Sequence, residues 1–392
     1  MRTTPLRIVV SGLAVTYPFG GVFWDYMQYL LGFARLGHDV LYVEDTGRWV
    51  YDPRAATFVE DAERNVKSFV DAIRMAAPMA ADCWFVRDSR DRTYGRSWRD
   101  VAAFCRSADL FLNISGASIM RDEYFAARTV AYLDSDPMYT QATVARWKID
   151  DVRKYHVFFT FAENIGAADC RVPEGGLQWI PTRQPIVLDC WRAASVPPGS
   201  RRDVLTTIAS WEPSERGPMI DGVAYRGKSV EFERFIDLPA RSPLPLELAL
   251  SGPAPSGRLQ NRGWRLVDAY AVSSDPLTYR RYLASSWGEW SVAKHAYVAS
   301  KSGWFSCRTA CYLALAVPAV VQDTGFGIAI PTGHGVLSFT SLDEAAGAIE
   351  SVLAAPRHHS TSALEIAREY FDSDRVLAHV LEQALDAQIP RR

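Results

Sequence analysis

The chain opens with a short apolar run, Leu6 to Gly12, that is rich in β-branched residues and ends in a glycine. Such a run is typical of a buried parallel strand. From Val22 to Leu36 the apolar residues recur near helical spacing, and Gly37 follows in the position of a C-cap. A second apolar run at 38–45 completes a strand, loop, helix and strand. This unit predicts a doubly wound sheet, in which ligands lie at the carboxyl ends of the strands.

The alternation of strands and helices continues along the chain. Further short apolar strands are predicted in the first half at 108–116, 129–137 and 156–163. Residues 173–200 are rich in Pro and Gly, which indicates a connector and places a domain boundary near 195. A second series then predicts strands at 203–210, 245–252 and 264–272, and helices at 228–238 and, with a break near Gly288, at 276–298.

The last third of the chain repeats the order of helix, strand and glycine loop. The pattern predicts a helix from about 307, a strand from Pro318, a strand at 335–339 and a helix at 341–355. Amphipathic helices are predicted over 362–388. The fold class expected from the whole pattern is α/β, with two Rossmann-like doubly wound domains, because 392 residues exceed one ordinary core.

Composition narrows the class of protein. With 48% hydrophobic and 22% charged residues, the chain is expected to be folded. Its formal net charge of -2 gives no global reason to bind nucleic acid or an anionic membrane. No apolar run approaches the roughly 20 residues that span a bilayer, so a cytoplasmic protein is expected.

The six cysteines are scattered, with no Cys-x-x-Cys pair and no nearby His at zinc-ligand spacing. We therefore expect reduced thiols, no dedicated metal site and no tightly bound cofactor. The first strand leads into "SGLAVTYPFGG" rather than Gly-x-Gly-x-x-Gly, which disfavours a Rossmann dehydrogenase.

The stretch "SGWFSCRTAC" at 302–311 has the composition of an anion site. Ser306 is a natural N-cap, and the helix after it would point free N–H groups and its positive dipole end outwards. Arg308 and Thr309 lie in the first turn, and Lys294 lies upstream. The next strand ends in a glycine loop that would face the same site, at Asp323, Thr324, Gly325 and Phe326. Two cations, a helix start and a glycine loop suit a diphosphate.

Two motifs resemble the two-domain GT-B nucleotide-sugar glycosyltransferases, most nearly the family 4-like (glycosyltransferase group 1) members. The first is "YPFGGVFWDYMQYLLGFARLGHDVLYVED", which is similar to their signature of Pro, Gly-Gly, a long helix and Gly-His-acid-Val. The second is "CYLALAVPAVVQDTGFG" with "PTGHGVLSFTSLDEAAGAI", which looks like their donor-domain run. The chain departs from them at Gly303 and Cys311, where retaining members carry two glutamates.

The resemblance implies two domains that face each other across a cleft. These would be an acceptor-side domain at 1–195, a nucleotide-sugar donor domain at 196–365, and a C-terminal helix at 366–392 that packs back on the first. It implies transfer of a sugar from a nucleoside diphosphate sugar to a small-molecule or glycan acceptor without a necessary metal. Gly20 and Gly21 would let the backbone approach the donor, and Arg308 and Lys294 would neutralise the leaving diphosphate.

A general base is needed to take the acceptor proton. Asp134 and Asp136 follow a first-domain strand at its carboxyl end, and Asp25 lies one helix turn past the Gly-Gly loop. The first two are favoured over Asp25, and His295 and His334 are weaker candidates. A bacterial origin and a natural-product pathway are suggested by the rich Arg and Ala usage. A sugar-nucleotide epimerase of the same fold and a non-catalytic nucleotide-sugar-binding protein remain alternatives, and the base, sugar, acceptor and oligomeric state stay open.

Overall fold

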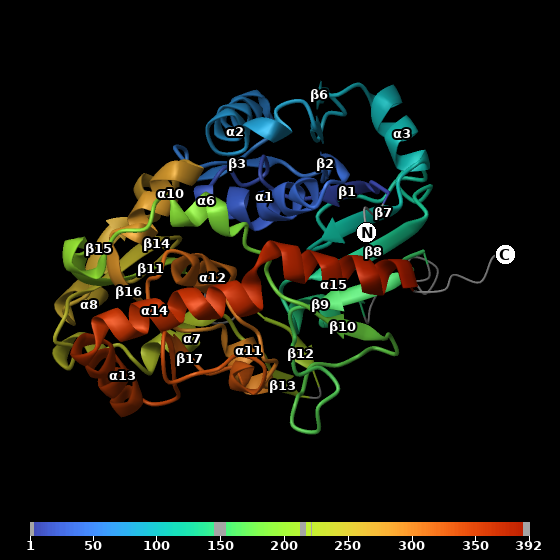
Figure 1. Cartoon of the computed structure of the whole chain (residues 1–392). Coiled ribbons are helices and arrows are strands. Elements are labelled where there is room, and N and C mark those ends of the chain that lie inside the picture. The colour runs from blue at the N-terminus through green and yellow to red at the C-terminus, as the bar shows by residue number, and fades with distance from the viewer. Residues whose placement is uncertain (1–3, 145–153, 212–216, 221, 387–392) are drawn as a thin grey trace.

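A computed structural model describes residues 4–144, 154–211, 217–220 and 222–386 (Figure 1). The part of the predicted C-terminal helix beyond residue 386 lies outside the described residues. The chain forms two large sheets in sequence order, each built from predominantly parallel strands with helices packed on its faces. The predicted α/β class with two doubly wound sheets is therefore confirmed.

The first sheet has eight strands in the order β10-β9-β8-β7-β1-β2-β5-β6, and only β6 runs antiparallel to its neighbour. Five strands, β1, β2, β7, β8 and β9, match the predicted apolar runs closely, because their side chains are buried on both faces. The strands are β1 (Arg7–Ser11), β2 (Asp39–Asp45), β5 (Trp84–Arg87), β6 (Thr93–Gly95), β7 (Leu110–Ile114), β8 (Thr129–Asp134), β9 (Val157–Thr160) and β10 (Trp179–Pro181).

Helix α1 (Gly20–Arg35) follows β1 and buries most of its residues beneath the first sheet. The other helices of this part of the chain are α2 (Glu63–Ala76), α3 (Trp98–Arg106), α4 (Tyr139–Val144) and α6 (Leu188–Arg192). A hairpin of β3 (Val50–Asp52) and β4 (Thr57–Val59) extends from β2. The predicted connector at 173–200 thus contains the edge strand β10 and the helix α6.

The loop between β1 and α1 is held by a buried carboxylate. Glu44 of β2 accepts hydrogen bonds from the amides of Val15 and Thr16, from the Thr16 hydroxyl and from the Tyr42 hydroxyl, at 2.6–2.8 Å. Burial raises the pKa of Glu44, and these four donors oppose the rise. The network fixes the path by which the chain leaves β1 and enters α1.

The second sheet has six parallel strands in the order β15-β14-β11-β16-β17-β18. They are β11 (Arg202–Ser210), β14 (Leu246–Ser251), β15 (Arg265–Asp268), β16 (Ser286–Ser291), β17 (Ala319–Gln322) and β18 (Val336–Phe339). Their helices are α7 (Lys228–Glu233), α8 (Ser256–Asn261), α9 (Ala269–Ser273), α10 (Pro276–Ala284), α11 (His295–Ser300), α12 (Cys307–Ala314) and α13 (Leu342–Ala354). A small hairpin joins β12 (Met219–Ile220) to β13 (Val223–Ala224).

The prediction of helix over 276–298 was wrong in its middle, where the structure has the central strand β16. Its sequence "SWGEWS" carries a glycine and a glutamate, which are uncommon in central strands. Gly288 is needed there because a Cβ would lie 2.8 Å from Leu205 and 3.1 Å from the Pro318 carbonyl. The predicted strand at 264–272 is also too long, since Asp268 caps α9 and ends β15.

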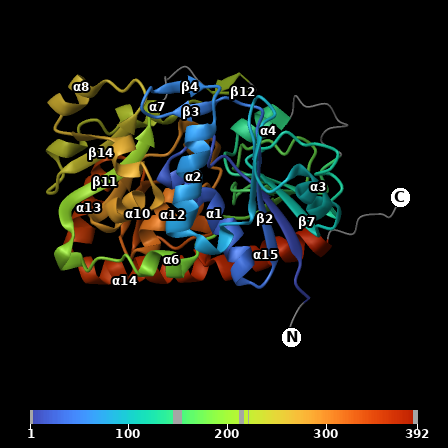
Figure 2. The same ribbon diagram turned by 90° about the horizontal axis from the view of Figure 1, so that it is seen from above.

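The last two helices cross from the second sheet to the first. Helix α14 (Pro356–Ile366) packs against α12 and α13, and α15 (Ser373–Asp386) packs against α1, with the red ribbon running along one side of the molecule (Figure 1, Figure 2). At Gly32 of α1 an added Cβ would lie 2.4 Å from Leu377. This close approach locks the end of the chain onto the first sheet's helix layer.

Candidate functional site

Each sheet has one point where its strand order reverses. In the first sheet the chain moves outwards from β1 to β2 and β5, then returns to β7 on the other side of β1. In the second it moves from β11 to β14 and β15, then returns to β16 on the other side of β11. Ligands of doubly wound sheets bind beyond the carboxyl ends of the strands at such a point. Cavities lie at both places.

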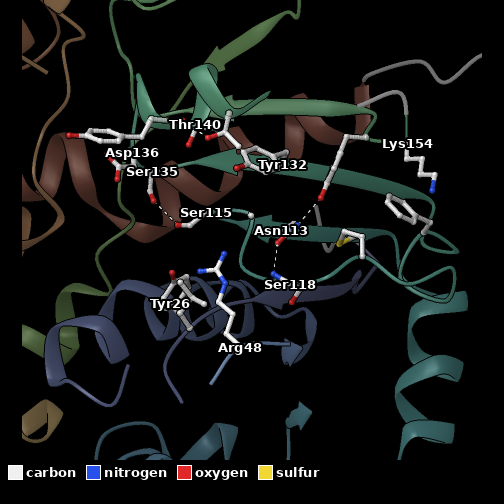
Figure 3. Close-up of a pocket in the computed structure, with 17 residues that line it drawn as sticks. Tyr26, Arg48, Asn113, Ser115, Ser118, Tyr132, Ser135, Asp136, Thr140 and Lys154 are labelled. Carbon is white, nitrogen blue, oxygen red and sulfur yellow. Dashed lines mark hydrogen bonds between the residues drawn. The ribbon is translucent and has the colours of Figure 1, made fainter. Parts of the chain in front are cut away.

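The first-sheet pocket has a volume of about 720 Å³ and lies beyond the carboxyl ends of β1, β7 and β8 (Figure 3). Its walls combine hydroxyl, amide and aromatic side chains with two cations and one carboxylate. They include Leu13, Tyr26, Arg48, Asn113, Ser115, Ser118, Met120, Phe125, Tyr132, Ser135, Asp136, Tyr139, Thr140, Thr143, Lys154 and Tyr155. The pocket is large enough for a small molecule.

The α12 cavity is the counterpart in the second sheet, at the ends of β16 and β17 and the start of α12. Its volume is about 20 Å³, which holds about one water molecule. The structure here brings together five of the predicted donor-side residues, which are Ser306, Arg308, Thr309, Thr324 and Phe326. Their predicted role in donor binding stays a prediction.

The start of α12 offers unused hydrogen-bond donors. Ser306 occupies the N-cap position, but its hydroxyl accepts no capping bond, so that part of the prediction was wrong. The amide groups of the first turn are therefore left without a capping side chain, with the positive end of the helix dipole beside them. The Thr309 hydroxyl is buried, and it has no hydrogen-bond partner in the described chain.

Arg308 is fixed by a buried ion pair with Glu289 of β16. Its Nε lies 2.8 Å from a Glu289 carboxylate oxygen, and its guanidinium also donates to the Ile208 carbonyl at 2.6 Å. Burial alone would lower the pKa of Arg308, and the Glu289 charge raises it overall. The second Glu289 oxygen is buried without a partner among the described residues. Sequence reasoning missed Glu289 because its segment was predicted as helix.

The loop after β17 is shaped by its own hydrogen bonds. Asp323 accepts from the Gly325 amide at 2.9 Å, and the Thr324 hydroxyl donates to the Trp304 carbonyl at 2.6 Å. The Phe326 ring packs edge-on against Phe305 at 5.1 Å. Asp323 and Thr324 thus hold the loop against the start of α12.

Asn164, which sequence reasoning also missed, joins the first sheet to these loops. Its amide donates to the carbonyls of Lys301 and Gly325 at 3.2 and 3.0 Å. Gly303 and Gly325 both have positive φ, +75° and +88°, and a Cβ on either would lie within 3 Å of Asn164. At Gly303, the structure therefore places the Asn164 side chain of the first half of the chain.

The predicted cation Lys294 reaches the first-sheet pocket. Its Nζ lies 2.8 Å from Asp136, which also accepts a hydrogen bond from the Tyr297 hydroxyl. The Trp304 indole donates to the Ser135 carbonyl at 3.2 Å, and Trp304 itself lines the α12 cavity. Asp136 and Trp304 thus mark where the two cavities adjoin. A role for Lys294 at a diphosphate stays a prediction.

The three predicted acids differ in their access. Asp134 is fully buried and accepts hydrogen bonds from Thr160, Gln141 and the Asp136 amide, at 2.6–2.8 Å. Burial raises the pKa of Asp134, and these bonds oppose the rise. Its carboxylate oxygens are occupied, so it shapes the turn after β8. Of the two acids after β8, Asp136 is the one that lines the pocket.

Asp25 faces the start of α12 from the neighbouring helix α1. Its carboxylate is half-buried and has no hydrogen bond from any described residue. Burial raises the pKa of Asp25 to about 7, and the positive charge of Arg308 moderates the rise. The next residue, Tyr26, lines the first-sheet pocket. Because consecutive helix residues point about 100° apart, Asp25 is directed away from the Tyr26 side of α1 and towards Arg308, and it lines neither of the two cavities.

The Gly-Gly pair has a packing reason in the structure. A Cβ on Gly20 would lie 2.3 Å from the Asp275 carbonyl, and one on Gly21 would lie 3.1 Å from the Tyr279 ring. Helix α10 therefore approaches the start of α1 closely. The predicted approach of a donor to these glycines stays a prediction.

The weaker histidine candidates have structural partners. His295 accepts from the Arg226 amide at 3.2 Å, and His334 lies 3.1 Å from a nitrogen of His358. In the described ranges no three His, Cys, Asp or Glu side chains are grouped so that they could hold a metal ion. None of the helices placed by the structure is both long and apolar enough to cross a membrane.

Comparison with solved structures decides the fold. An alpha-glucosyltransferase in complex with UDP aligns over 97% of this chain and 99% of its own, with a TM-score of 0.61 and 9% identity. The chain has the GT-B fold. The glycosyltransferase AviGT4, involved in avilamycin A biosynthesis, aligns over 97% of both chains with a TM-score of 0.54 and 12% identity. Anabaena Alr3699/HepE in complex with UDP and glucose aligns over 96% of this chain and 99% of its own, with a TM-score of 0.58 and 10% identity.

No protein-family model matches the sequence, and no curated protein matches it. At 9–12% identity the GT-B neighbours establish the fold. The chemistry of this GT-B chain must therefore be argued from its own residues.

The raised pKa of Asp25 predicts a pH-dependent stability cost. The folded state holds a proton on Asp25 more tightly than the unfolded chain does. Protonated Asp25 therefore contributes to the free energy of unfolding at low pH, and this contribution is lost as pH rises through about 7. We expect Asp25→Asn to be more stable than the natural chain by about 2 kcal/mol at pH 8, with this advantage shrinking towards pH 5. Urea unfolding at both pH values measures it, with the exposed Asp122→Asn as control. If the two chains differ equally in their free energy of unfolding at both pH values, the raised pKa assigned to Asp25 is contradicted.

Proposed function

We propose that the protein transfers a glycosyl group from a nucleoside diphosphate sugar to a hydroxyl acceptor. The observation that carries the proposal is the open start of α12 beside Arg308, at the reversal point of the second sheet. Free backbone amides, a helix dipole and a fixed cation form a site for an anion, and a diphosphate fits its charge.

The donor would lie across two small cavities that share Ser291 and Val292. One is the α12 cavity, which would receive the diphosphate. The other is lined by the aromatic side chains of Trp211, Phe232 and Trp290 and would receive the base by stacking. Because the α12 cavity holds about one water molecule, the residues that line it must move apart before a donor can enter. The bonds of Asn164 to the loops at Lys301 and Gly325 are the contacts that such an opening would break.

Asp25 is the base that this geometry favours over Asp134 and Asp136. Asp134 is occupied by hydrogen bonds, and Asp136 is held by Lys294 and Tyr297. Asp25 has a pKa of about 7, which suits proton transfer near neutral pH. Its carboxylate would take the acceptor hydroxyl proton as that oxygen bonds to the sugar C1. The bond from C1 to the diphosphate breaks, and Arg308 and the α12 amides stabilise the leaving negative charge.

Several finer assignments belong to this proposal. We propose the division into domains at 1–195, 196–365 and 366–392, a family 4-like relationship, and action without a metal. The acceptor would be a small molecule or glycan in a bacterial natural-product pathway, in keeping with the involvement of AviGT4 in avilamycin A biosynthesis. Some alpha-glucosyltransferase neighbours are complexes with DNA. For this chain the net charge of -2 favours an acceptor other than nucleic acid.

The role of Arg308 can be tested without leaving the Glu289 carboxylate unpaired in the core. Arg308→Ala would leave Glu289 alone in the core, so we choose Glu289→Gln and the double variant Glu289→Gln/Arg308→Gln. We expect saturable binding of UDP, GDP or dTDP by the natural chain. Glu289→Gln, which keeps the cation, should bind no more weakly, and the double variant should bind at least about tenfold more weakly.

Isothermal titration calorimetry measures these affinities, with Glu233→Gln/Arg258→Gln, which removes an exposed ion pair, as a control of equal charge change for the double variant. Equal nucleotide affinity in the natural chain and the double variant would contradict the assignment of Arg308. Absence of nucleotide binding by the folded natural chain would overturn the proposed function itself.

The base assignment predicts a loss of donor cleavage with donor binding retained. Asp25→Asn should lower the rate of nucleoside diphosphate release by about 100-fold or more, because the group that accepts the proton is gone. The natural rate should rise with pH through about 7, as Asp25 loses its proton. Nucleotide release from sugar nucleotides, measured with water or added acceptors, gives both results, with Asp122→Asn as the control.

The reaction products distinguish the transferase from the two alternative functions. A new sugar nucleotide, or a free sugar epimerised at a carbon other than C1 and formed without acceptor, would indicate the epimerase. Nucleotide binding with no turnover under any acceptor would indicate a binding protein. An unchanged release rate in Asp25→Asn would assign the proton transfer to another group.

A further inference from the structure

The first-sheet pocket contains a cation without a carboxylate partner among the described residues. Figure 3 shows Arg48 extending from the segment after β2 into the pocket, between Tyr26 and Ser118. Among the described residues its guanidinium has no hydrogen bond and no ion pair, and only its backbone amide is bonded, to Thr46. Arg87, Arg92 and Arg121, by contrast, have carboxylate partners.

The one carboxylate among the described lining side chains of the pocket already has a cationic partner. This carboxylate is Asp136, and Lys294 pairs with it from the second sheet. Lys154 lies at the opposite side of the pocket, near the Phe125 ring. Among the described lining residues, no carboxylate therefore remains to pair with Arg48.

A second group in the pocket also lacks a partner. Ser118 is 6% exposed, and its hydroxyl has no hydrogen bond within the described chain. Its neighbour Asn113 has partners at both its oxygen and its nitrogen, since it accepts from Ser11 and from the Ser118 amide and donates to Tyr155. A buried hydroxyl without a partner costs free energy, which a ligand oxygen can recover. The open hydroxyl and the open cation lie on the same side of the pocket (Figure 3).

We propose that this pocket takes an acidic acceptor, a small molecule with a carboxylate or phosphate at Arg48 and Ser118 and a hydroxyl towards Asp136. This inference rests on the proposed transfer reaction. Arg48 is exposed to solvent, and an acceptor that covers it must replace the water on its guanidinium. An acid replaces that water with a charge-assisted, bidentate hydrogen bond from the guanidinium.

The orientation follows from the neighbouring cavity. The Asp136 end of the pocket adjoins Trp304, which lines the α12 cavity. The acceptor hydroxyl belongs at this end because the sugar must arrive from α12.

Matched pairs of probes test the preference by calorimetry on the full chain without donor. The pairs are 4-hydroxybenzoate against 4-hydroxybenzamide, and glucose 6-phosphate against glucose, so that the arms distinguish a carboxylate from a phosphate. We expect at least one acid to bind roughly tenfold more tightly than its neutral partner. Arg48→Gln should remove the preference and Ser118→Ala should reduce it, while Arg54→Gln, an exposed arginine outside the pocket, should leave it unchanged.

Equal binding of both acids and their neutral partners, binding of neither acid, or a preference that survives in Arg48→Gln would overturn the inference. Titration with UDP, GDP and dTDP in the same preparations separates the two proposals. Nucleotide binding without acid preference overturns the acidic acceptor alone. Acid preference without nucleotide binding overturns the transfer reaction and leaves an anion-binding pocket.

Discussion

The buried ion pair of Arg308 and Glu289 is the interaction on which the second sheet's site depends. It joins the first turn of α12 to the central strand β16, at 2.8 Å, with Glu289 fully buried. Either charge alone would be strongly unfavourable in that position, so the pair fixes the helix start against the sheet. The unpaired second oxygen of Glu289 and the unpaired Thr309 hydroxyl show that polar groups here are only partly satisfied. Such incomplete satisfaction is more common at functional sites than in ordinary cores.

The two halves of the chain meet through polar contacts at the same place. Asn164 bonds to both donor-side loops, Asp136 pairs with Lys294, and Trp304 bonds to Ser135. Away from them, α10 packs on α1 at Gly20, and α15 packs on α1 at Gly32. The hydrophobic contacts of α10 and α15 hold the two sheets together. Beside Asn164, a buried hydrophobic cluster that includes Met138, Ala162, Ala296 and Tyr297 adds to the polar contacts.

Much of the fold could be predicted from the sequence, because the buried parallel strands and the amphipathic helices have clear periods. The strand β16 could not, since Gly288 and Glu289 weaken its pattern and only the partner Arg308, 19 residues later, explains the charge. The positions of the predicted residues around α12 follow from the local order of helix, strand and loop. Arg48, Ser118 and Asn164 could not be found, because isolated polar residues give no signal until the sheet brings distant loops together.

The choice among Asp25, Asp134 and Asp136 also could not be made from the sequence. The sequence favours Asp134 and Asp136 because they follow a strand at its carboxyl end. It does not show that Thr160, Gln141 and Lys294 occupy them. The environment of Asp25 depends on α12 packing against α1, a contact between segments nearly 300 residues apart in the chain. Tertiary packing, more than local pattern, decides which carboxylate is free to accept a proton.

Hydrogen–deuterium exchange with a bound nucleoside diphosphate is the decisive test of the α12 site. The nucleotide would be whichever of UDP, GDP and dTDP raises the unfolding temperature most. We expect slower amide exchange at 302–309 and 323–326, where the α12 start and the loop after β17 would enclose the diphosphate. No thermal shift with any of the three, or protection confined to segments outside these loops, would show that the diphosphate does not bind there.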